Sequence, residues 1–472
     1  MKLRTTVLSV ILCAVSTSSF ADSLVRIYEL ALTNDYQFQR AKSIYKADAE
    51  LSNIARSKLY PSIKADYTLR SLQEDSTIRQ LITPVGGTLL ESDVMLDRNV
   101  NHRGWSLKLE QPIFDAPAWY GYQRGKTQVI IADAIFDKAK QDLLLRVVDA
   151  YLNVLRAQDN LAAARAQERA FSRQLEQTKQ RFDSGLIPIT EVTESQAAYD
   201  LVAVRTLEEE NSVEITLEGM ANLTGKQHLV LNLLRSDFIV TPPEPNDINE
   251  WAEAASSFNL QLLIARQTRA AAEEKQKAAK WEHSPKLTLG IFASNMNTGG
   301  TVGSSIDSPF ILEPDQNIDT LGIELRLQIP LYEGGATSAN SRRAGYQYQA
   351  SRDLVRETRR SVNTEARQLF LKVKSDMSRI QGRRASILSA KAALDAAEAG
   401  YGIGTRNIID VLNAQNVLFS AERDYANSRY DYIQNSFRLR ATGASLSSGD
   451  IYRLDAFLKP PSSQQAIQRA VR

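Results

Sequence analysis

The most constraining feature of this sequence is that it is written twice. The segment Arg181–Val192 aligns with Gly400–Val411 at an offset of 219 residues, and Pro112 aligns with Pro330 at an offset of 218. The matches occur in the same order in both halves. Self-similarity of this kind indicates a structural repeat, here a unit of about 220 residues, rather than a series of unrelated domains.

The repeat divides the chain of 472 residues into five parts. Pro242, Pro243 and Pro245 give the segment between the halves the composition of a linker. We therefore expect a signal peptide over residues 1–21, a first structural repeat over 22–225, a linker or equatorial segment over 226–248, a second structural repeat over 249–448 and an equatorial C-terminal tail over 449–472.

The N-terminal segment has the pattern of an export signal. Lys2 and Arg4 precede an apolar run over 7–15, and residues 19–21 form a small-x-small cleavage site, so the mature chain is predicted to begin near Asp22. A short membrane anchor is an alternative, although the run is too short to span a bilayer. A lipidated Cys13 is another. Cleavage after Ala21 removes the only cysteine, which excludes disulfides and thiolate metal sites.

The charge balance excludes one class of partner. The formal net charge of +2 is carried by Lys2 and Arg4, so the mature chain holds 55 basic and 55 acidic residues. A chain without net charge does not bind nucleic acid through bulk electrostatics. We therefore expect no nucleic-acid partner.

Four segments contain a strict alternation of apolar and polar residues, over 63–70, 105–110, 287–291 and 321–329. This pattern predicts strands near 61–70, 103–113, 285–294 and 320–330. The pattern allows an amphipathic sheet over a soluble core or a barrel with lipid outside and water inside. Charge density on the polar face of an exported chain favours the barrel. The polar stretches 71–102 and 295–320 are expected to be loops. The charged residues on the polar face are Lys64, Asp66, Arg70, Lys108, Glu110, Glu324 and Arg326.

Two long segments predict helices that no globule can bury. Residues 126–184 contain neither Gly nor Pro, and at ~1.5 Å per residue such a helix spans roughly 90 Å. Residues 346–399 contain one Gly. Apolar residues recur in steps of three and four along both segments, as in a coiled-coil seam. Gly185 and Gly404 then predict tight turns after which the chain returns as a second helix.

Four strands do not close a membrane barrel, because the smallest such barrels have about eight. Open strand edges are too costly in lipid. The chain is therefore predicted to self-associate, with two copies giving eight strands and three giving twelve.

The duplicated halves, the two tip segments and residues 111–115 make the chain similar to the TolC family of outer-membrane efflux and secretion channels. The resemblance implies a mainly α fold with a membrane β-barrel, built from duplicated helix–strand–strand–helix–helix units. It further implies a homotrimer whose twelve-stranded β-barrel, with four strands per chain, is continuous with a long periplasmic α-helical coiled-coil barrel. The equatorial region is then expected from residues 226–250 and from about 449 onward.

The function implied by the resemblance is an exit duct in the Gram-negative outer membrane, extending into the periplasm. Such a duct serves tripartite multidrug efflux pumps, type I protein secretion systems, or both. Its partners are outer-membrane lipid, a periplasmic adaptor (membrane fusion) protein and an inner-membrane pump or ABC transporter. Two alternatives are a structural coiled-coil outer-membrane protein without a pump and a general porin.

The resemblance also suggests the residues of a periplasmic gate. It implies tip contacts of Glu191 with Arg406, Thr190 with Tyr401, and Gln174 with Glu398, while the Gly185 and Gly404 turns dock the adaptor. Three copies of Asp410 then form an acidic ring around the axis. Asn413 stands where many relatives carry a second Asp, which weakens the expected cation block.

No residue pattern predicts catalysis, a cofactor or a metal. The three histidines, at positions 102, 228 and 283, have no metal-ligand spacing. Gly219–Lys226 differs from a phosphate-binding loop in its spacing and in the Gln227 that follows the lysine. We expect a passive conduit that depends on partner proteins for energy, not an enzyme.

Overall fold

The computed structural model describes residues 21–82, 90–228, 230–304 and 315–461. Residues 1–20 of the predicted leader, with Cys13, and residues 462–472 of the predicted tail lie outside this part. The fold divides into two compact units, and the divisions fall within helices, after residues 45, 132, 264 and 355. Each unit therefore combines pieces of both sequence repeats.

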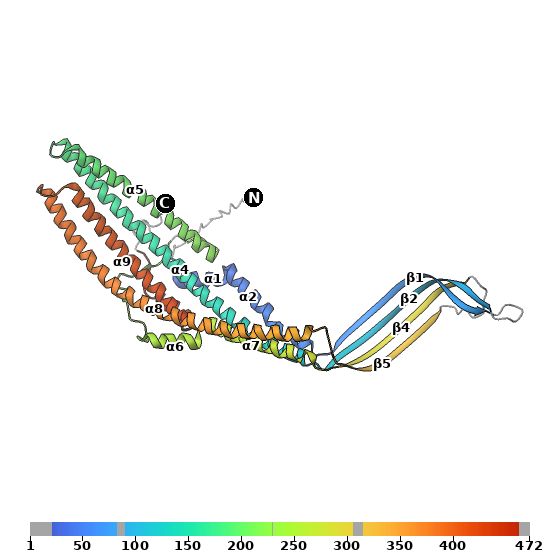
Figure 1. Cartoon of the computed structure of the whole chain (residues 1–472). Coiled ribbons are helices and arrows are strands. Elements are labelled where there is room, and N and C mark those ends of the chain that lie inside the picture. Colours follow the sequence, from blue (N-terminus) through green and yellow to red (C-terminus); the bar gives the residue numbers. More distant parts are fainter. Residues whose placement is uncertain (1–20, 83–89, 229, 305–314, 462–472) are drawn as a thin grey trace, which may run out of the picture. The chain divides into compact units, whose positions relative to one another are not determined.

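Helices form the larger part of the chain (Figure 1). Two helical hairpins, α4–α5 and α8–α9, run side by side with their turns at the same end. The helices are α1 Leu24–Asn34, α2 Tyr36–Ala49, α3 Leu51–Ser57, α4 Ala116–Asp183, α5 Ile189–Thr224, α6 Ile248–Phe258, α7 Leu260–Lys280, α8 Ala336–Gly402, α9 Ile408–Thr442 and α10 Ser448–Asp455. A short 3-10 helix covers Trp281–His283.

The predicted seams are buried where the hairpins pack. Leu152 and Leu155 of α4 are fully buried, and Val373 of α8 is 1% exposed. All three belong to one apolar core that also takes residues from α1, α6, α9 and α10. The long helices are thus stabilised by packing along one another, as the three-four spacing predicts.

Four strands form one antiparallel sheet in the order β1-β2-β4-β5. They are β1 Ser62–Ile82, β2 Leu90–Phe114, β4 Lys286–Ser304 and β5 Gln316–Gln328. The register places Lys64 opposite Lys108 and Gly290 opposite Glu324, which keeps the charged positions on one face. The other face is apolar, and Leu321, Ile323, Leu325 and Leu327 are between 61% and 81% exposed on it.

The strands are longer than the sequence predicts. The prediction that residues 71–102 and 295–320 are loops is wrong over most of both stretches, because β1 continues to Ile82 and β2 begins at Leu90, while β4 continues to Ser304. The alternating pattern reports a difference in polarity between the two faces, whereas strand pairing needs only backbone donors and acceptors.

The linker and the tail meet at a small second sheet. Strand β3 (Leu233–Leu234) pairs antiparallel with β6 (Leu458–Lys459). Helix α6 packs nearby, where the ring of Trp251 comes within 3.3 Å of the position that a Cβ on Gly443 would occupy. Gly443 therefore permits close packing, and the left-handed residue at the end of α9 is Ala444, with φ 53°.

Within the described residues, no helix has the length and apolarity required to cross a membrane.

Candidate functional site

The two hairpin tips have the same backbone turn. In the first, Gly185 has φ 72°, its N–H donates to the carbonyl of Phe182, and the N–H of Leu186 donates to the carbonyl of Arg181. In the second, Gly404 has φ 77° and equivalent bonds join Gly404 to Tyr401 and Thr405 to Gly400. These paired bonds are those of a helix end closed by a left-handed glycine.

The helices that leave the two tips begin differently. Helix α5 is preceded by Pro188, which offers no side-chain cap. Helix α9 is preceded by Asn407, whose side chain accepts a hydrogen bond from the Asp410 N–H at 2.9 Å. The Asp410 carboxylate accepts in return from the Asn407 N–H at 3.4 Å, which completes a capping box. Asp410, half-buried, therefore has a local structural role beside the predicted ring.

A side-chain hydrogen bond links the tips of the two hairpins. The hydroxyl of Tyr401, at the end of α8, donates to Oε2 of Glu191, in the first turn of α5, at 3.2 Å. The guanidinium carbon of Arg181 lies 4.5 Å from the centre of the Tyr401 ring. Burial raises the pKa of Tyr401 above its ordinary value, and the Glu191 charge adds to this. The phenol is therefore protonated and available as a donor.

The structure pairs the predicted tip residues differently from our expectation. Glu191, expected to pair with Arg406, bonds Tyr401, which was expected to bond Thr190. The stem of Arg406 instead packs beside Gly400, where an added Cβ would lie 3.0 Å from its Cγ. Because this stem folds back onto its own turn, the Arg406 side chain stays at the exposed tip. Thr190 and Asn413 are also exposed.

A polar crevice of about 560 Å³ lies between the hairpins at the tip. It brings together three of the predicted residues: Gln174, which is buried, Glu398, which is exposed, and Tyr401. An apolar cluster that includes Phe171, Ile408 and Val411 packs the same two hairpins together. The crevice is lined by Gln174, Gln177, Gln180, Arg181, Ser184, Leu186, Glu398, Tyr401, Gly402 and Val411.

A second set of polar contacts, absent from the sequence prediction, joins α4 to α9. We call it the polar ladder. Its signal in the sequence is a row of polar residues beside the α4 seam, but helical spacing alone does not identify their partners. Its contacts are Asp149 with Arg438 (3.0 Å), Asn153 with Gln434 (3.1 Å), Arg156 with Asp431 (2.7 Å) and Gln167 with Asn416 (2.6 Å).

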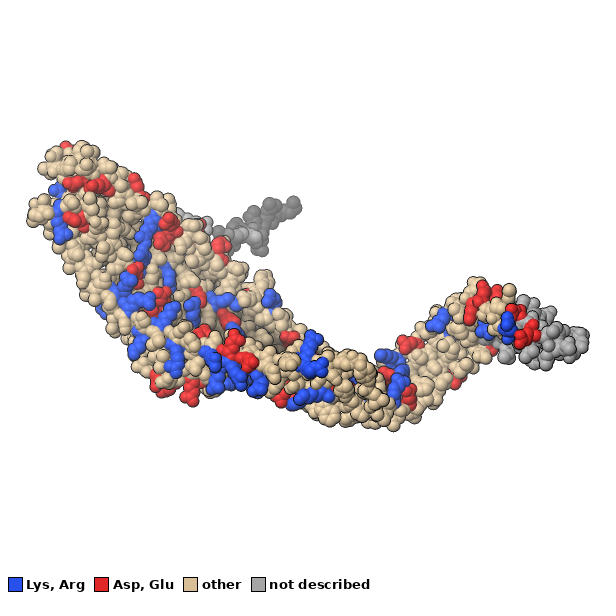
Figure 2. Space-filling view, viewed as in Figure 1, with Lys and Arg blue, Asp and Glu red and all other residues tan. Residues whose placement is uncertain are grey.

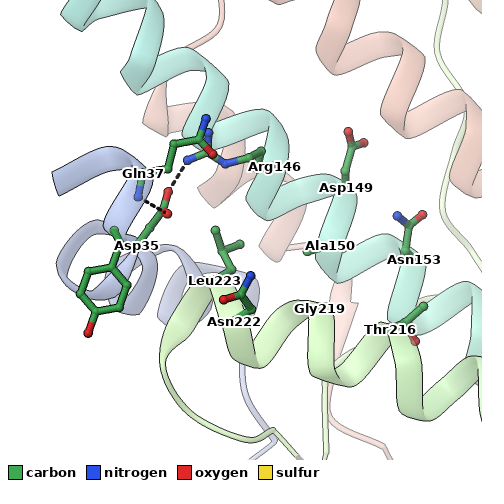
Figure 3. A pocket seen from close by; sticks show the side chains of 11 residues that line it. Asp35, Gln37, Arg146, Asp149, Ala150, Asn153, Thr216, Gly219, Asn222 and Leu223 are labelled. Atoms are coloured by element: carbon green, nitrogen blue, oxygen red, sulfur yellow. Dashed lines mark hydrogen bonds and ion pairs between the residues drawn. The ribbon is translucent and has the colours of Figure 1, made fainter. Parts of the chain in front are cut away.

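Another groove, of about 520 Å³, lies beside the N-terminus of α2. Arg146 reaches from α4 to the carboxylate of Asp35, which also accepts from the N–H of Gln37 at 3.0 Å (Figure 3). This carboxylate thereby holds the start of α2 against α4. The other lining residues include Asp149, Asn153, Thr216 and Asn222.

Charges of both signs lie on the face that Figure 2 shows. Acidic and basic side chains are intermixed over the face of the helical part visible in Figure 2. In the part of the chain that the structure describes, no group of three or more His, Cys, Asp or Glu side chains is arranged to hold a metal ion.

Comparison with known protein families shows the same duplication. The sequence profile of the outer membrane efflux protein family matches residues 27–226 and again residues 251–444, once in each repeat. The chain belongs to the outer membrane efflux protein family. It is 30% identical to the outer membrane protein TolC of Escherichia coli over 98% of this chain and 90% of that protein.

Two further comparisons extend the family assignment. The chain is 28% identical to the alkaline protease secretion protein AprF of Pseudomonas aeruginosa, over 95% of this chain and 90% of that protein. Its fold matches the Campylobacter jejuni CmeC outer membrane channel with a TM-score of 0.70 at 16% identity, over 97% of this chain and 98% of that one. This family member is a Gram-negative outer-membrane protein with the channel-tunnel fold, and it forms an exit duct.

Proposed function

We propose that three copies of this chain form a passive duct whose periplasmic entrance is held closed by contacts between its hairpin tips. The observation that carries this proposal is the hydrogen bond from Tyr401 to Glu191, which ties α8 to α5 at their ends. Breaking it removes a polar tie between the two tips, which the apolar cluster still packs together.

The open sheet supports the trimer. Strands β1 and β5 lie at the two edges of the described sheet, and such edges present unpaired backbone groups. In lipid these groups must be paired, and edge-to-edge association of copies pairs them while placing the apolar face outward. Three copies supply twelve strands, an ordinary number for an outer-membrane barrel.

The exposed tips support docking of a partner. Gly185 and Gly404 stand at the ends of the two hairpins, and nothing lies within 4 Å of the Cβ position at either glycine. We propose that a periplasmic adaptor protein binds these turns and couples the duct to an inner-membrane pump or ABC transporter. The duct itself catalyses no reaction, and the partner supplies the energy.

Arg406 and Asp410 complete the proposed entrance. The exposed Arg406 latches the tip against neighbouring copies, and three Asp410 carboxylates attract cations near the axis. Gln174 and Glu398 line the crevice behind them. Arg406→Ala should enlarge the single-channel conductance in planar bilayers, and an unchanged conductance would rule out the latch.

The cargo is tested in cells. A strain that lacks the chain should become sensitive to several unrelated drugs, should lose export of a secreted protease, or should show both defects. Similarity to a protease secretion protein supports the second outcome. Complementation by the wild type but not by a variant lacking the tip turns would link export to docking. High constitutive conductance of the wild type would instead favour the general porin, and absence of any conductance would favour the structural protein.

A further inference from the structure

The start of the described chain is fixed by backbone bonds to the linker. The N–H of Asp22 donates to the carbonyl of Val230 at 2.9 Å, and the carbonyl of Asp22 accepts from the N–H of Asn232 at 3.2 Å. Residue 22 thus forms a parallel bridge with Leu231. The position of this one residue is set by a segment about two hundred positions further along the sequence.

The side chain of Asp22 enters a buried polar relay. Its Oδ2 lies 2.7 Å from Nδ1 of His228, and Nε2 of His228 lies 2.7 Å from the hydroxyl of Thr224. The His228 side chain is 2% exposed. Arg26 pairs with the other carboxylate oxygen at 3.2 Å. A histidine buried to this extent needs a partner at each ring nitrogen, and Asp22 supplies one of them.

A second carboxylate reaches the same place from the end of the chain. Asp455, the last residue of α10, accepts from the N–H of Leu24 at 2.8 Å. Beneath the segment, the fully buried Tyr151 donates to the carbonyl of Asn232 at 2.8 Å and lies 3.2 Å from the carbonyl of Asp22. Its pKa is raised well above the ordinary value by burial, and the charges of Asp455 and Asp22 add to this.

We infer that these groups form a docking site for the free amino terminus of the processed chain, which begins at Asp22. Residues 19–21 have the small-x-small pattern of a leader cleavage site, and Asp22 is the residue that follows it. Hydrolysis by a leader peptidase adds the hydroxyl of water to the carbonyl carbon of Ala21 and a proton to the nitrogen of Asp22. The leader departs with a new carboxylate, and Asp22 gains an α-amino group.

The site suits an ammonium better than the amide it replaces. The nitrogen of Asp22 keeps its bond to the Val230 carbonyl and gains further donors. The carboxylates of Asp22 and Asp455 flank the segment, and Arg26 provides one cation, so an added positive charge balances the second carboxylate. Leader removal thereby strengthens the contacts that join the first repeat, the linker and α10.

The first measurement is the amino terminus itself. Mass spectrometry of protein purified from outer membranes should show a chain that begins at Asp22. An α-amine-selective acylating reagent at neutral pH should label this terminus at least tenfold more slowly in the folded protein than in the same protein after denaturation. A terminus at another residue, or equal labelling rates, would overturn the inference.

The second measurement displaces the amino group. Insertion of Gly-Ser between Ala21 and Asp22 keeps the cleavage site and moves the terminus away by two residues. This variant should be labelled rapidly when folded, and its unfolding midpoint should fall by about 3 °C. The same dipeptide inserted between Pro242 and Pro243 is the control, and it should leave both quantities unchanged. If the extended variant does not reach the membrane, the comparison of folded and denatured wild type still decides.

Discussion

Glu191 and Asp410 occupy equivalent positions in the two repeats, 219 residues apart, but their carboxylates have different partners. Glu191 accepts from the Tyr401 hydroxyl of the other hairpin, whereas Asp410 accepts from the N–H of Asn407 in its own cap. The cause is local: Pro188 has no N–H to donate and no side-chain cap, while Asn407 has both. Divergence at the cap therefore frees Glu191 to join the two hairpins.

Tyr401→Phe removes the hydroxyl that makes this link and keeps the aromatic ring. Loss of one hydrogen bond of this kind costs about 1 kcal/mol, which corresponds to roughly a fivefold shift toward the open entrance for each copy. Single-channel recordings in planar bilayers should show larger or more frequent openings.

The control for this change is Tyr199→Phe, a tyrosine that packs on the apolar cluster shared by the same hairpins. It should leave the recordings unchanged. Equal behaviour of the two variants would show that the hydroxyl of Tyr401 does not hold the entrance.

Asp410→Asn separates the charge of the proposed ring from the helix cap. An asparagine oxygen still accepts from the N–H of Asn407, so the start of α9 is kept while three negative charges are lost. The reversal potential in a salt gradient should move toward lower cation selectivity.

Asn407→Ala makes the opposite change. It removes the cap at a cost of about 1 kcal/mol in stability and leaves the charges in place. Thermal unfolding in detergent should show a lower midpoint with the reversal potential of the wild type. If both variants shift selectivity equally, the cap rather than the charge sets it.

We predict that the ion pairs of the polar ladder add to the apolar packing that holds α4 against α9. Arg156 bonds Asp431 at 2.7 Å and Gln434 at 3.2 Å, and the side chains of the ion pair are about one-third exposed. Arg156→Met should lower the free energy of unfolding by about 1–2 kcal/mol. The substitution leaves Asp431 without its nearest cation, and the partial exposure of the pair to solvent limits the loss.

Lys138→Met is the matched control on the same helix. Lys138 pairs with Asp142 at 2.9 Å within one turn, and both side chains are at least 40% exposed. A pair of this kind contributes less than about 1 kcal/mol. Chemical denaturation of the two variants should therefore separate them, and equal losses would remove the special role of the ladder.

Sequence alone predicted much of this fold because its signals are local or periodic. The glycine turns, the seams and the alternating faces of β1 and β5 each follow from spacing. The partners at the tips could not be predicted in this way. Thr190 and Glu191 are neighbours in the sequence, and spacing alone does not decide which of them faces Tyr401. The ladder and the relay of Asp22, His228 and Thr224 join residues far apart in sequence, and no local pattern records such pairs.

The surroundings of Asp376 set the direction in which the stability of the fold depends on pH. This residue is fully buried on α8, accepts from Asn435 of α9 at 2.7 Å and pairs with Arg379 at 2.8 Å. Burial raises its pKa above the ordinary 3.8, and Asp431 of α9 also raises it, while Asn435, Arg379 and Lys372 oppose the shift. The folded state thus binds the proton on Asp376 more tightly than the unfolded state does. The stability that this proton adds is fully present below the unfolded-state pKa of 3.8, and it is lost as the pH rises through the folded-state pKa.

Asp376→Asn should therefore raise the unfolding midpoint at pH 7, because the amide needs no proton and still accepts from Asn435. The difference from wild type should shrink as the pH falls toward the ordinary carboxyl value. Asp395→Asn, an exposed carboxylate on the same helix, is the control and should show no such trend. Melting curves in detergent between pH 4 and pH 8 measure the effect. A variant less stable than wild type at pH 7 would show instead that the ion pair with Arg379 outweighs the cost of burying the charge.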